Sequence, residues 1–184
     1  MSREIKQVAA TEFLSLNTLR DSNIDESVTY DFVHETKCNG RKIAILPFDL
    51  NELNIPEYFY LMDEYVPCWG SSSRLVSITG SVELSSPTIE AVCEELQEES
   101  GFHLPSDSDR IIPLGYCFSS KMLSSHFELY AIDVTGLSAA AAKTDGSVLE
   151  SLSTCNRIHR DKFNLCVDPL AYVMRSRLLD KISR

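Results

Sequence analysis

Glutamates are concentrated on one predicted helix, and their spacing suits a metal ion. The helix is predicted over residues 86–100. Its glutamates are Glu90, Glu94, Glu95, Glu98 and Glu99. Glutamates four residues apart repel each other and destabilise a helix by about 0.2–0.5 kcal/mol per pair. No Lys or Arg lies between Arg74 and Arg110 to dilute this charge. A hard divalent cation such as Mg²⁺ or Mn²⁺ would offset the repulsion, because it prefers carboxylate oxygens.

The same glutamates have a second interpretation that needs no metal. The helix could present an acidic face to solvent, with compensating Lys or Arg side chains supplied from elsewhere in the fold. Composition alone slightly favours this interpretation, because the chain carries 27 acidic residues against 17 basic ones, a formal net charge of -10. The glycines that flank the helix, Gly80 and Gly101, shift the balance toward the metal site.

The residues around the glutamates indicate how the helix is positioned. Ser86 is a good N-cap, Pro87 suits the first helical position, and Gly101 suits the C-terminal stop. Leu75–Ile78 is predicted as a short strand that runs into Gly80. The apolar stripe that would bury the helix consists of Ile89, Val92, Cys93 and Leu96.

Strands are predicted on both sides of this helix, and a second helix follows at the C-terminus. Asn39-Gly40 is a hairpin signal after the first strand, residues 137–143 could be a short helix or a loose loop, and residues 169–182 have helical periodicity. Mixed strands with two or three helices indicate an α+β fold, an α/β/α sandwich. The predicted strands are residues 28–33, 42–47, 58–62, 111–112 and 127–134.

The length of 184 residues fits one domain with a short N-terminal extension. Residues 1–27 carry apolar side chains at roughly helical spacing, which predicts a helical extension, and residues 28–184 would form the domain. The acidic balance argues against general nucleic-acid binding, because a basic face is needed to neutralise phosphates.

The residues from Gly80 to Phe102 follow a demanding spacing. Gly80 begins the segment, and Glu95-Leu96-Gln97-Glu98-Glu99-Ser100-Gly101-Phe102 closes it. This segment resembles a Nudix box, which is a Gly, five residues, a Glu, seven residues and then Arg-Glu-apolar-x-Glu-Glu-x-Gly-apolar. Two positions depart from that pattern, because Ser86 replaces the earlier Glu and Glu94 replaces the Arg. The chain is therefore similar to the Nudix hydrolase superfamily, with a degenerate box.

The resemblance implies a Nudix fold and hydrolysis of a nucleoside diphosphate linked to another group, of the ADP-ribose or nucleotide-sugar type. Glu95, Glu98 and Glu99 match the principal metal ligands, so they would hold Mg²⁺ or Mn²⁺, and Glu98 would also be catalytic. Because Ser86 and Glu94 depart from the box, the rival interpretation is a catalytically impaired Nudix-fold protein that binds nucleotides or has a regulatory role.

Other candidate site residues are predicted from their positions. Tyr65, Trp69 and Arg74 precede Gly80, where base stacking and phosphate contacts could occur, and Gly80 itself is included in the substrate site. Tyr65 and Trp69 could equally be core or interface residues. Glu150, in a polar loop, is the candidate general base, because this superfamily often supplies one from outside the box. Its alternative role is that of a solvated loop residue.

The layout outside the box is similar to the ADP-ribose pyrophosphatase branch. The features are Gly115-Tyr116 with the polar loop that follows, the strand 127–134 and the N-terminal extension. That resemblance implies that a homodimer could form through the N-terminal segment. The chain has no apolar secretion signal and no stretch of membrane-span length, and its six cysteines form no CxxC pair. We therefore expect a cytoplasmic protein with reduced thiols.

Overall fold

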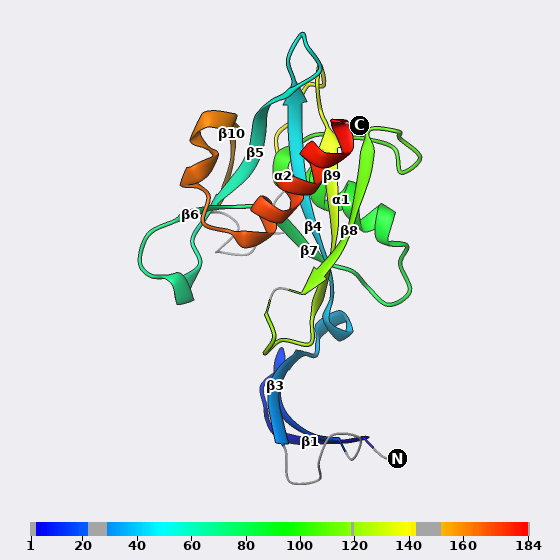
Figure 1. Ribbon diagram of the computed structural model, residues 1–184, viewed down its shortest axis with the longest axis vertical. Helices are drawn as coiled ribbons and strands as arrows, with labels where there is room; N and C mark the ends of the chain where they lie inside the picture. Colours follow the sequence, from blue (N-terminus) through cyan, green and yellow to red (C-terminus); the bar gives the residue numbers. More distant parts are fainter. Residues whose placement is uncertain (1–2, 22–28, 119, 143–151, 184) are drawn as a thin grey trace.

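The computed structural model describes residues 3–21, 29–118, 120–142 and 152–183, which form two β-sheets and two α-helices (Figure 1). The helices are α1 (Thr88–Ser100) and α2 (Pro169–Ile182), and the 3-10 helices are η1 (Lys37–Gly40), η2 (Pro67–Trp69) and η4 (Arg160–Leu165). The smaller sheet contains β1 (Arg3–Ala10), β2 (Leu14–Asp21) and β3 (Thr29–Glu35). The larger sheet contains β4 (Arg41–Leu50), β5 (Pro56–Glu64), β6 (Arg74–Val76), β7 (Ile78–Ser81), β8 (Ile111–Phe118), β9 (His126–Asp133) and β10 (Thr154–His159).

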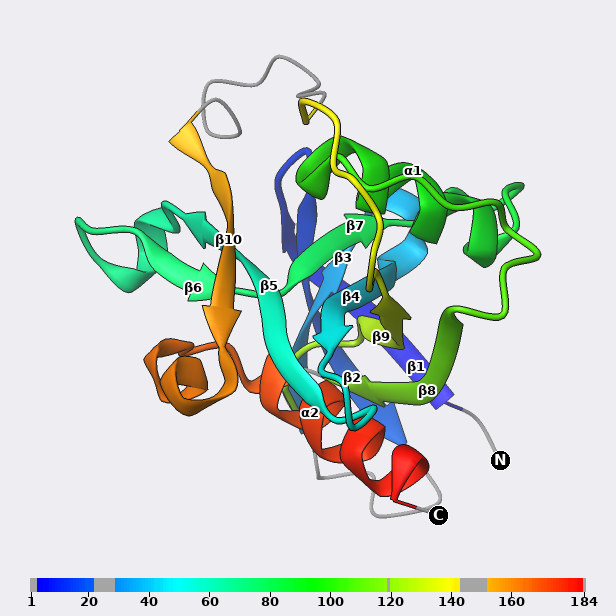
Figure 2. The same cartoon turned by 90° about the horizontal axis from the view of Figure 1, so that it is seen from above.

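The larger sheet lies between the two α-helices, which makes an α/β/α sandwich (Figure 2). Its strand order is β10-β5-β4-β9-β8, with β6 paired to β5 and β7 paired to β4. Strands β4 and β9 run parallel, whereas β8 and β9, like β4 and β5, run antiparallel. The sheet is therefore mixed, and the predicted α+β class is confirmed.

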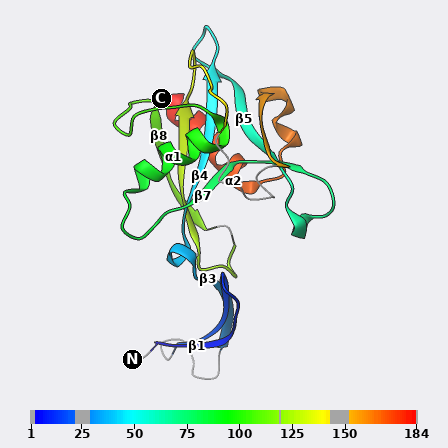
Figure 3. The ribbon, with the colours of Figure 1, turned by 180° about the vertical axis from the view of Figure 1, so that it is seen from behind.

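Strand β4 divides the hydrophobic core into two layers. Ile43 and Ile45 belong to the core cluster under α1, whereas Ala44, Leu46 and Phe48 belong to the cluster under α2. All five side chains are buried, as the alternating faces of a central strand require. Figure 3 shows α1 in front of the sheet and α2 behind it. The apolar stripe predicted for α1 packs into the first cluster, which fixes the direction of the glutamates that lie beside it on the helix.

The N-terminal residues form strands, so the predicted helical extension is wrong. Residues 3–21 make an antiparallel pair, β1 with β2, and β2 pairs in turn with β3. Apolar spacing near the helical period does not outweigh the cross-strand pairing of three consecutive strands. The sheet projects away from the sandwich (Figure 1). Ile5, Val8 and Phe13 on it are each more than half exposed, and the homodimer through this segment stays a prediction.

The Asn39-Gly40 signal marks a connection between sheets rather than a hairpin. Strand β3 belongs to the smaller sheet and β4 to the larger one. Cys38, Asn39 and Gly40 all have positive φ, of 52°, 52° and 67°, within η1. The hairpin predicted at Asn39-Gly40 is therefore wrong, and the left-handed residues instead form η1, which links two strands that both run parallel to residues 123–133. Strand β3 is further attached to the sandwich by a backbone hydrogen bond from Val33 N to Met122 O, of 2.8 Å.

Helix α1 begins at Thr88, and Ser86 is not its cap. The N-cap position is held by Pro87 without a side-chain hydrogen bond, and Ser86 N donates to Glu83 O in a turn at 3.1 Å. The guanidinium of Arg41 on β4 holds this loop, because it donates to Glu83 O and to Thr88 Oγ1, each at 3.2 Å. A long-range contact from the central strand therefore takes the place of the local cap that was predicted.

The C-terminal end of α1 follows the prediction. Gly101 adopts the left-handed conformation with φ of 74°, and its N–H donates to Gln97 O at 3.0 Å. A Cβ atom on Gly101 would also overlap the backbone of Ala140. Residues 137–142, which were left open between helix and loop, contain no helix, and residue 143 lies outside the described residues. Gly101 therefore serves both as a helix stop and as a packing position for that loop.

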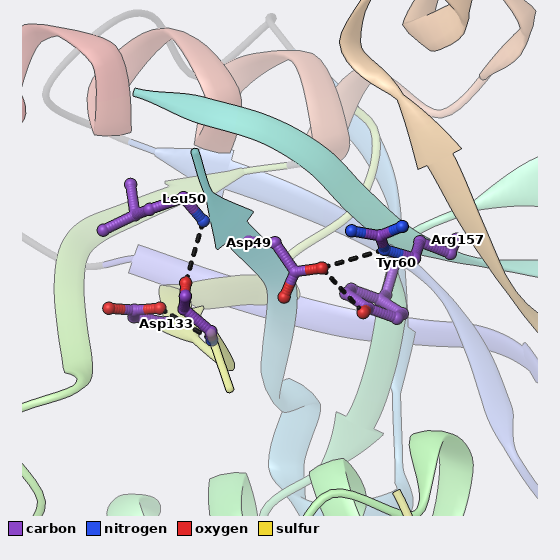
Figure 4. A network of polar contacts seen from close by, with 6 residues as sticks. Asp49, Leu50, Tyr60, Asp133 and Arg157 are labelled. Carbon is purple, nitrogen blue, oxygen red and sulfur yellow. Dashed lines mark hydrogen bonds and ion pairs between the residues drawn. The ribbon is translucent and has the colours of Figure 1, made fainter. Parts of the chain in front are cut away.

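Polar side chains join β10 to the centre of the sheet (Figure 4). Asp49 Oδ2 accepts from the Tyr60 hydroxyl and from Arg157 Nε, both at 2.9 Å. Arg157 also lies over the ring of Tyr58, 3.4 Å from its centroid. Burial, reinforced by the hydrogen bond and charge of Asp49, raises the pKa of Tyr60 to about 12. These contacts fix β10, which the sequence did not predict, against β5.

Asp168 attaches the start of α2 to the junction of β6 and β7. Its buried carboxylate accepts from Leu170 N at 2.9 Å, from Ser77 N at 3.0 Å and from the Ser77 hydroxyl. We expect Asp168→Ala to lower the free energy of unfolding by about 2–4 kcal/mol, because a helix cap is lost and the Ser77 donors are left buried and unpaired. Urea unfolding followed by circular dichroism measures this difference. Asp180→Ala, at an exposed position of α2, is the matched control. A similar loss in both variants would contradict the role of Asp168.

Candidate functional site

A cavity of about 310 Å³ opens where η1, β4 and β7 meet the acidic side of α1. Ten residues line it, and they come from four separate segments of the chain. Most of these residues carry charged or hydroxyl side chains, so the cavity suits a charged ligand better than an apolar one. Its lining residues are Lys37, Cys38, Lys42, Thr79, Gly80, Ser81, Glu83, Glu95, Glu98 and Glu99.

The fold brings four of the predicted site residues together in this cavity. Gly80 lies on β7, and Glu95, Glu98 and Glu99 lie on the last turns of α1. Glu98 is exposed, whereas Glu95 and Glu99 are partly buried. Glu98 and Glu99 follow Glu95 by three and four residues. In an α-helix this spacing places the three side chains on one side of the helix. The structure therefore brings these four residues to one cavity, and their roles in binding metal and substrate stay predictions.

Gly80 is required by the position of Glu95. A Cβ atom added at Gly80 would overlap the Oε1, Cδ and Cγ atoms of Glu95, at distances that real Cβ atoms do not show. Gly80 is not in the positive-φ region, so the requirement comes from space and not from backbone conformation. The strand therefore passes directly beneath the glutamate carboxylate, and the missing side chain leaves the room that the carboxylate occupies.

Two cations missed by the sequence analysis also line the cavity. Lys37 lies in η1 and Lys42 at the start of β4. The ammonium of Lys42 forms an ion pair with Glu35 Oε2 at 3.0 Å and lies 5.6 Å from the centroid of the Phe127 ring. The second interpretation of the glutamates, with cations supplied from elsewhere in the fold, stays a prediction, because the ion pair of Lys42 is with Glu35 on β3. The signal was the pair of lysines flanking Asn39-Gly40, which lie close to β7 and α1 only in the folded chain.

Glu94, which stands where the box has Arg, lies apart from the cavity. It is exposed on α1 and is absent from the residues that line the cavity. Burial, together with the charges of Glu94 and Glu90, raises the pKa of the neighbouring Cys93 thiol. Glu94 therefore lies on the solvent-exposed side of the helix. The Cys93 thiol stays neutral and packs against the core, as its position on the apolar stripe indicates.

A further thiol lies under the C-terminal end of α1. Burial and the charge of Glu99 raise the pKa of Cys155 on β10 to about 12. The thiol is therefore neutral at physiological pH and is a poor nucleophile. All six cysteines are free in the structure.

The donor chemistry of the cavity fits a divalent metal ion. Carboxylate oxygens are the ligands that Mg²⁺ and Mn²⁺ prefer, and Glu95, Glu98 and Glu99 share one cavity with room above Gly80. Within the described residues, no three His, Cys, Asp or Glu side chains are grouped closely enough to hold one metal ion. Binding would therefore have to draw the carboxylates together, at the cost of ordering the exposed side chain of Glu98.

The other predicted site residues do not meet these glutamates. Tyr65, Trp69 and Arg74 are absent from the cavity lining and belong to the segment around η2 and β6. Trp69 is 47% exposed, and Arg74 donates to Ser73 O at 3.1 Å, so neither is a core residue. Their role in substrate binding stays a prediction. Glu150 lies outside the described residues.

Comparisons with known proteins bear on the fold. No protein-family model matches the chain, and no curated protein sequence matches it. A solved structure described as the crystal structure of an ADP compounds hydrolase matches with a TM-score of 0.63, at 17% sequence identity, over 98% of this chain and 94% of that one. Such a likeness shows the fold, and the chain therefore has the Nudix fold. No helix in the described part of the chain combines the length and hydropathy of a membrane span.

Proposed function

We propose that this protein is a metal-dependent hydrolase that cleaves the pyrophosphate of a nucleoside diphosphate linked to another group, of the ADP-ribose or nucleotide-sugar type. The observation that carries the proposal is that Gly80, Glu95, Glu98 and Glu99 line one cavity. The fold is consistent with it, because the similar solved structure is that of an ADP compounds hydrolase.

In this proposal the glutamates at the end of α1 hold the metal. Glu95, Glu98 and Glu99 would each contribute carboxylate oxygens, and Glu95 would be oriented by its contact with Gly80. A bound Mg²⁺ or Mn²⁺ would lower the pKa of a water molecule and neutralise charge on the pyrophosphate. Attack of the water oxygen on phosphorus would break one P–O bond of the bridge, and Glu150 is proposed as the base that accepts the proton.

The second candidate function is nucleotide binding without turnover. The specific observations that favour it are Glu94 on the outside of α1 in place of the box Arg, and carboxylates that are not grouped around one point within the described residues. Both functions require a ligand with a diphosphate in the same cavity. They differ in whether the bridging bond is broken.

Product analysis separates the two candidates. The protein is incubated with ADP-ribose, a nucleotide sugar, a dinucleotide and a nucleoside triphosphate, each with Mg²⁺ or Mn²⁺. Release of a nucleoside monophosphate, in amounts that increase with time and enzyme concentration, would support the hydrolase. Binding of ADP-ribose measured by calorimetry, without any product, would instead support the binding protein.

Thermal melting tests the metal site independently of turnover. We expect saturating MnCl₂ to raise the melting temperature by about 5–10 °C, because binding at 100 times the dissociation constant contributes about 2.7 kcal/mol to a domain of this size. NaCl at matched ionic strength is the control, and Glu98→Gln should reduce the shift. An unchanged melting temperature with MnCl₂ would rule out a metal site of useful affinity in the isolated protein.

A further inference from the structure

A chain of hydrogen bonds joins the start of α1 to strands β4 and β9. Arg41 Nη2 donates to Thr88 Oγ1 at 3.2 Å, and the Thr88 hydroxyl donates to Glu128 Oε1, also at 3.2 Å. The Tyr130 hydroxyl donates to the other carboxylate oxygen, Glu128 Oε2, at 3.2 Å. All four side chains are partly buried. Thr88 is the first residue of α1, so these hydrogen bonds reach the helix that carries the cavity glutamates.

The donors and acceptors in this chain of hydrogen bonds fit together in one direction. A guanidinium has no acceptor, so the Arg41 side chain donates and the Thr88 oxygen accepts. The Thr88 hydroxyl donates its own proton to the carboxylate of Glu128, which accepts when it is ionised. Burial, followed by the charge and hydrogen bond of Glu128, raises the pKa of Tyr130 to about 12, so its hydroxyl keeps its proton and donates as well. Thr88 therefore links a positive and a negative side chain that come from two different strands.

The register of the sheet explains why these groups meet. Strands β4 and β9 are parallel, and Ile43 pairs with Glu128. Ile43 belongs to the core cluster under α1, so Glu128 projects from the same face of the sheet, as does Arg41 two residues before Ile43. The backbone of Arg41 also holds the loop that precedes α1, because Val82 N donates to Arg41 O at 3.0 Å. The start of α1 is therefore attached to two neighbouring strands at once.

The position of α1 matters to the cavity because the carboxylate of Glu95 lies directly against β7. A Cβ atom on Gly80 would overlap that carboxylate, so the helix has little room to move toward the strand. Glu95 follows Thr88 by seven residues, which corresponds to about 10 Å along the helix axis. We propose that Arg41, Thr88 and Glu128 are positioning residues for the metal site, because they hold α1 at the position that the cavity requires. This inference rests on the proposed function for the identity of the site.

Two variants of Thr88 test the proposal with little change in shape. Valine replaces the hydroxyl by a methyl group and removes both hydrogen bonds, whereas serine keeps them. We expect Thr88→Val to raise the dissociation constant for Mn²⁺ about fivefold, and to lower kcat for ADP-ribose about tenfold with KM within about twofold, because the ligand glutamates are then held less accurately. Thr88→Ser should stay within about twofold of the wild-type protein in all three quantities. Equal effects of valine and serine would overturn the proposal.

Arg41→Gln has a matched control on the other face of the sheet. Arg177 on α2 donates through Nη1 to Leu114 O at 2.9 Å and to Tyr116 O at 3.1 Å, much as Arg41 Nη1 donates to two carbonyls of the loop before α1. We expect Arg41→Gln to raise the Mn²⁺ dissociation constant about fivefold, and Arg177→Gln to leave it within about twofold while lowering the melting temperature. An equal loss of Mn²⁺ affinity in both variants would identify general destabilisation as the cause and would overturn the proposal.

Calorimetric titration with Mn²⁺ needs no turnover, so it keeps this inference separate from the proposed function. If the wild-type protein hydrolyses no compound of the class but loses Mn²⁺ affinity in Thr88→Val and not in Thr88→Ser, the hydrolase proposal fails and this inference stands. If ADP-ribose is hydrolysed and Thr88→Val matches the wild-type protein in Mn²⁺ affinity and kcat, this inference fails and the hydrolase stands. No binding of Mn²⁺ by the wild-type protein would overturn the inference.

Discussion

Replacement of Glu98 by Gln is expected to reduce kcat for ADP-ribose by roughly 10³-fold, which corresponds to about 4 kcal/mol of transition-state stabilisation. The amide removes one negative charge from the cavity and is a poorer ligand for a hard cation. Because Glu98 is exposed, its loss should not unfold the protein, so the free energy of unfolding should change by less than about 0.5 kcal/mol. Initial rates with Mg²⁺ and with Mn²⁺, together with a urea titration, measure both quantities.

The matched control for this variant is Glu90→Gln. Glu90 is an exposed glutamate of the same helix, in its first turn, and it does not line the cavity. Its replacement changes the helix charge by the same amount at a different place. We expect kcat within about threefold of the wild-type value. Equal losses in the two variants would show that the overall helix charge matters rather than a ligand at position 98, and would contradict the proposed metal site.

Replacement of Gly80 by Ala is expected to reduce kcat/KM by roughly 10²-fold or more, because the added methyl group occupies the space of the Glu95 carboxylate. Either the side chain of Glu95 moves or β7 shifts away from α1. In both cases a ligand is displaced by about 1 Å or more, which is enough for a loss of that size. The added strain should also cost about 1–3 kcal/mol of stability, as overpacking does elsewhere.

A double-mutant cycle identifies the cause of that loss. In a background of Glu95→Ala the obstructing carboxylate is absent, so adding Gly80→Ala should cost little further stability. Urea unfolding of the wild type, the two single variants and the double variant gives the coupling energy between positions 80 and 95. A coupling energy near zero would mean that Gly80 acts through the backbone of β7, and the steric explanation would then be incorrect.

Local signals in the sequence were sufficient for the central part of the site. The spacing of glutamates on α1 and the glycine stop at Gly101 are found in the structure, whereas the strand predicted over residues 75–78 is divided at Ser77 between β6 and β7, and Gly80 lies within β7. The prediction of α2 over residues 169–182 also agrees with the observed helix. These features depend on contacts within one element or between neighbours in the chain. For such features, periodicity and capping preferences act directly.

Signals that depend on distant partners were misinterpreted or missed. Residues 3–21 have apolar spacing near that of a helix, but backbone pairing of β1 with β2 and of β2 with β3 makes them strands. Ser86 has the chemistry of a cap, but Arg41 on β4 organises the loop that precedes α1. Strand β10 has little apolar alternation, and it depends on side chains such as Asp49 for its place in the sheet.

The sequence by itself determined the Nudix-like arrangement of Gly80 and the glutamates, because the geometry of one helix and one turn places those groups at a fixed spacing. Tertiary structure decided what lies near them. Lys37 and Lys42 line the cavity beside residues of β7 and α1 that lie far later in the chain. Residues that are far apart in sequence become neighbours only when sheet pairing and helix packing close the fold, so no local pattern could have revealed that Lys37 and Lys42 line the same cavity as the glutamates.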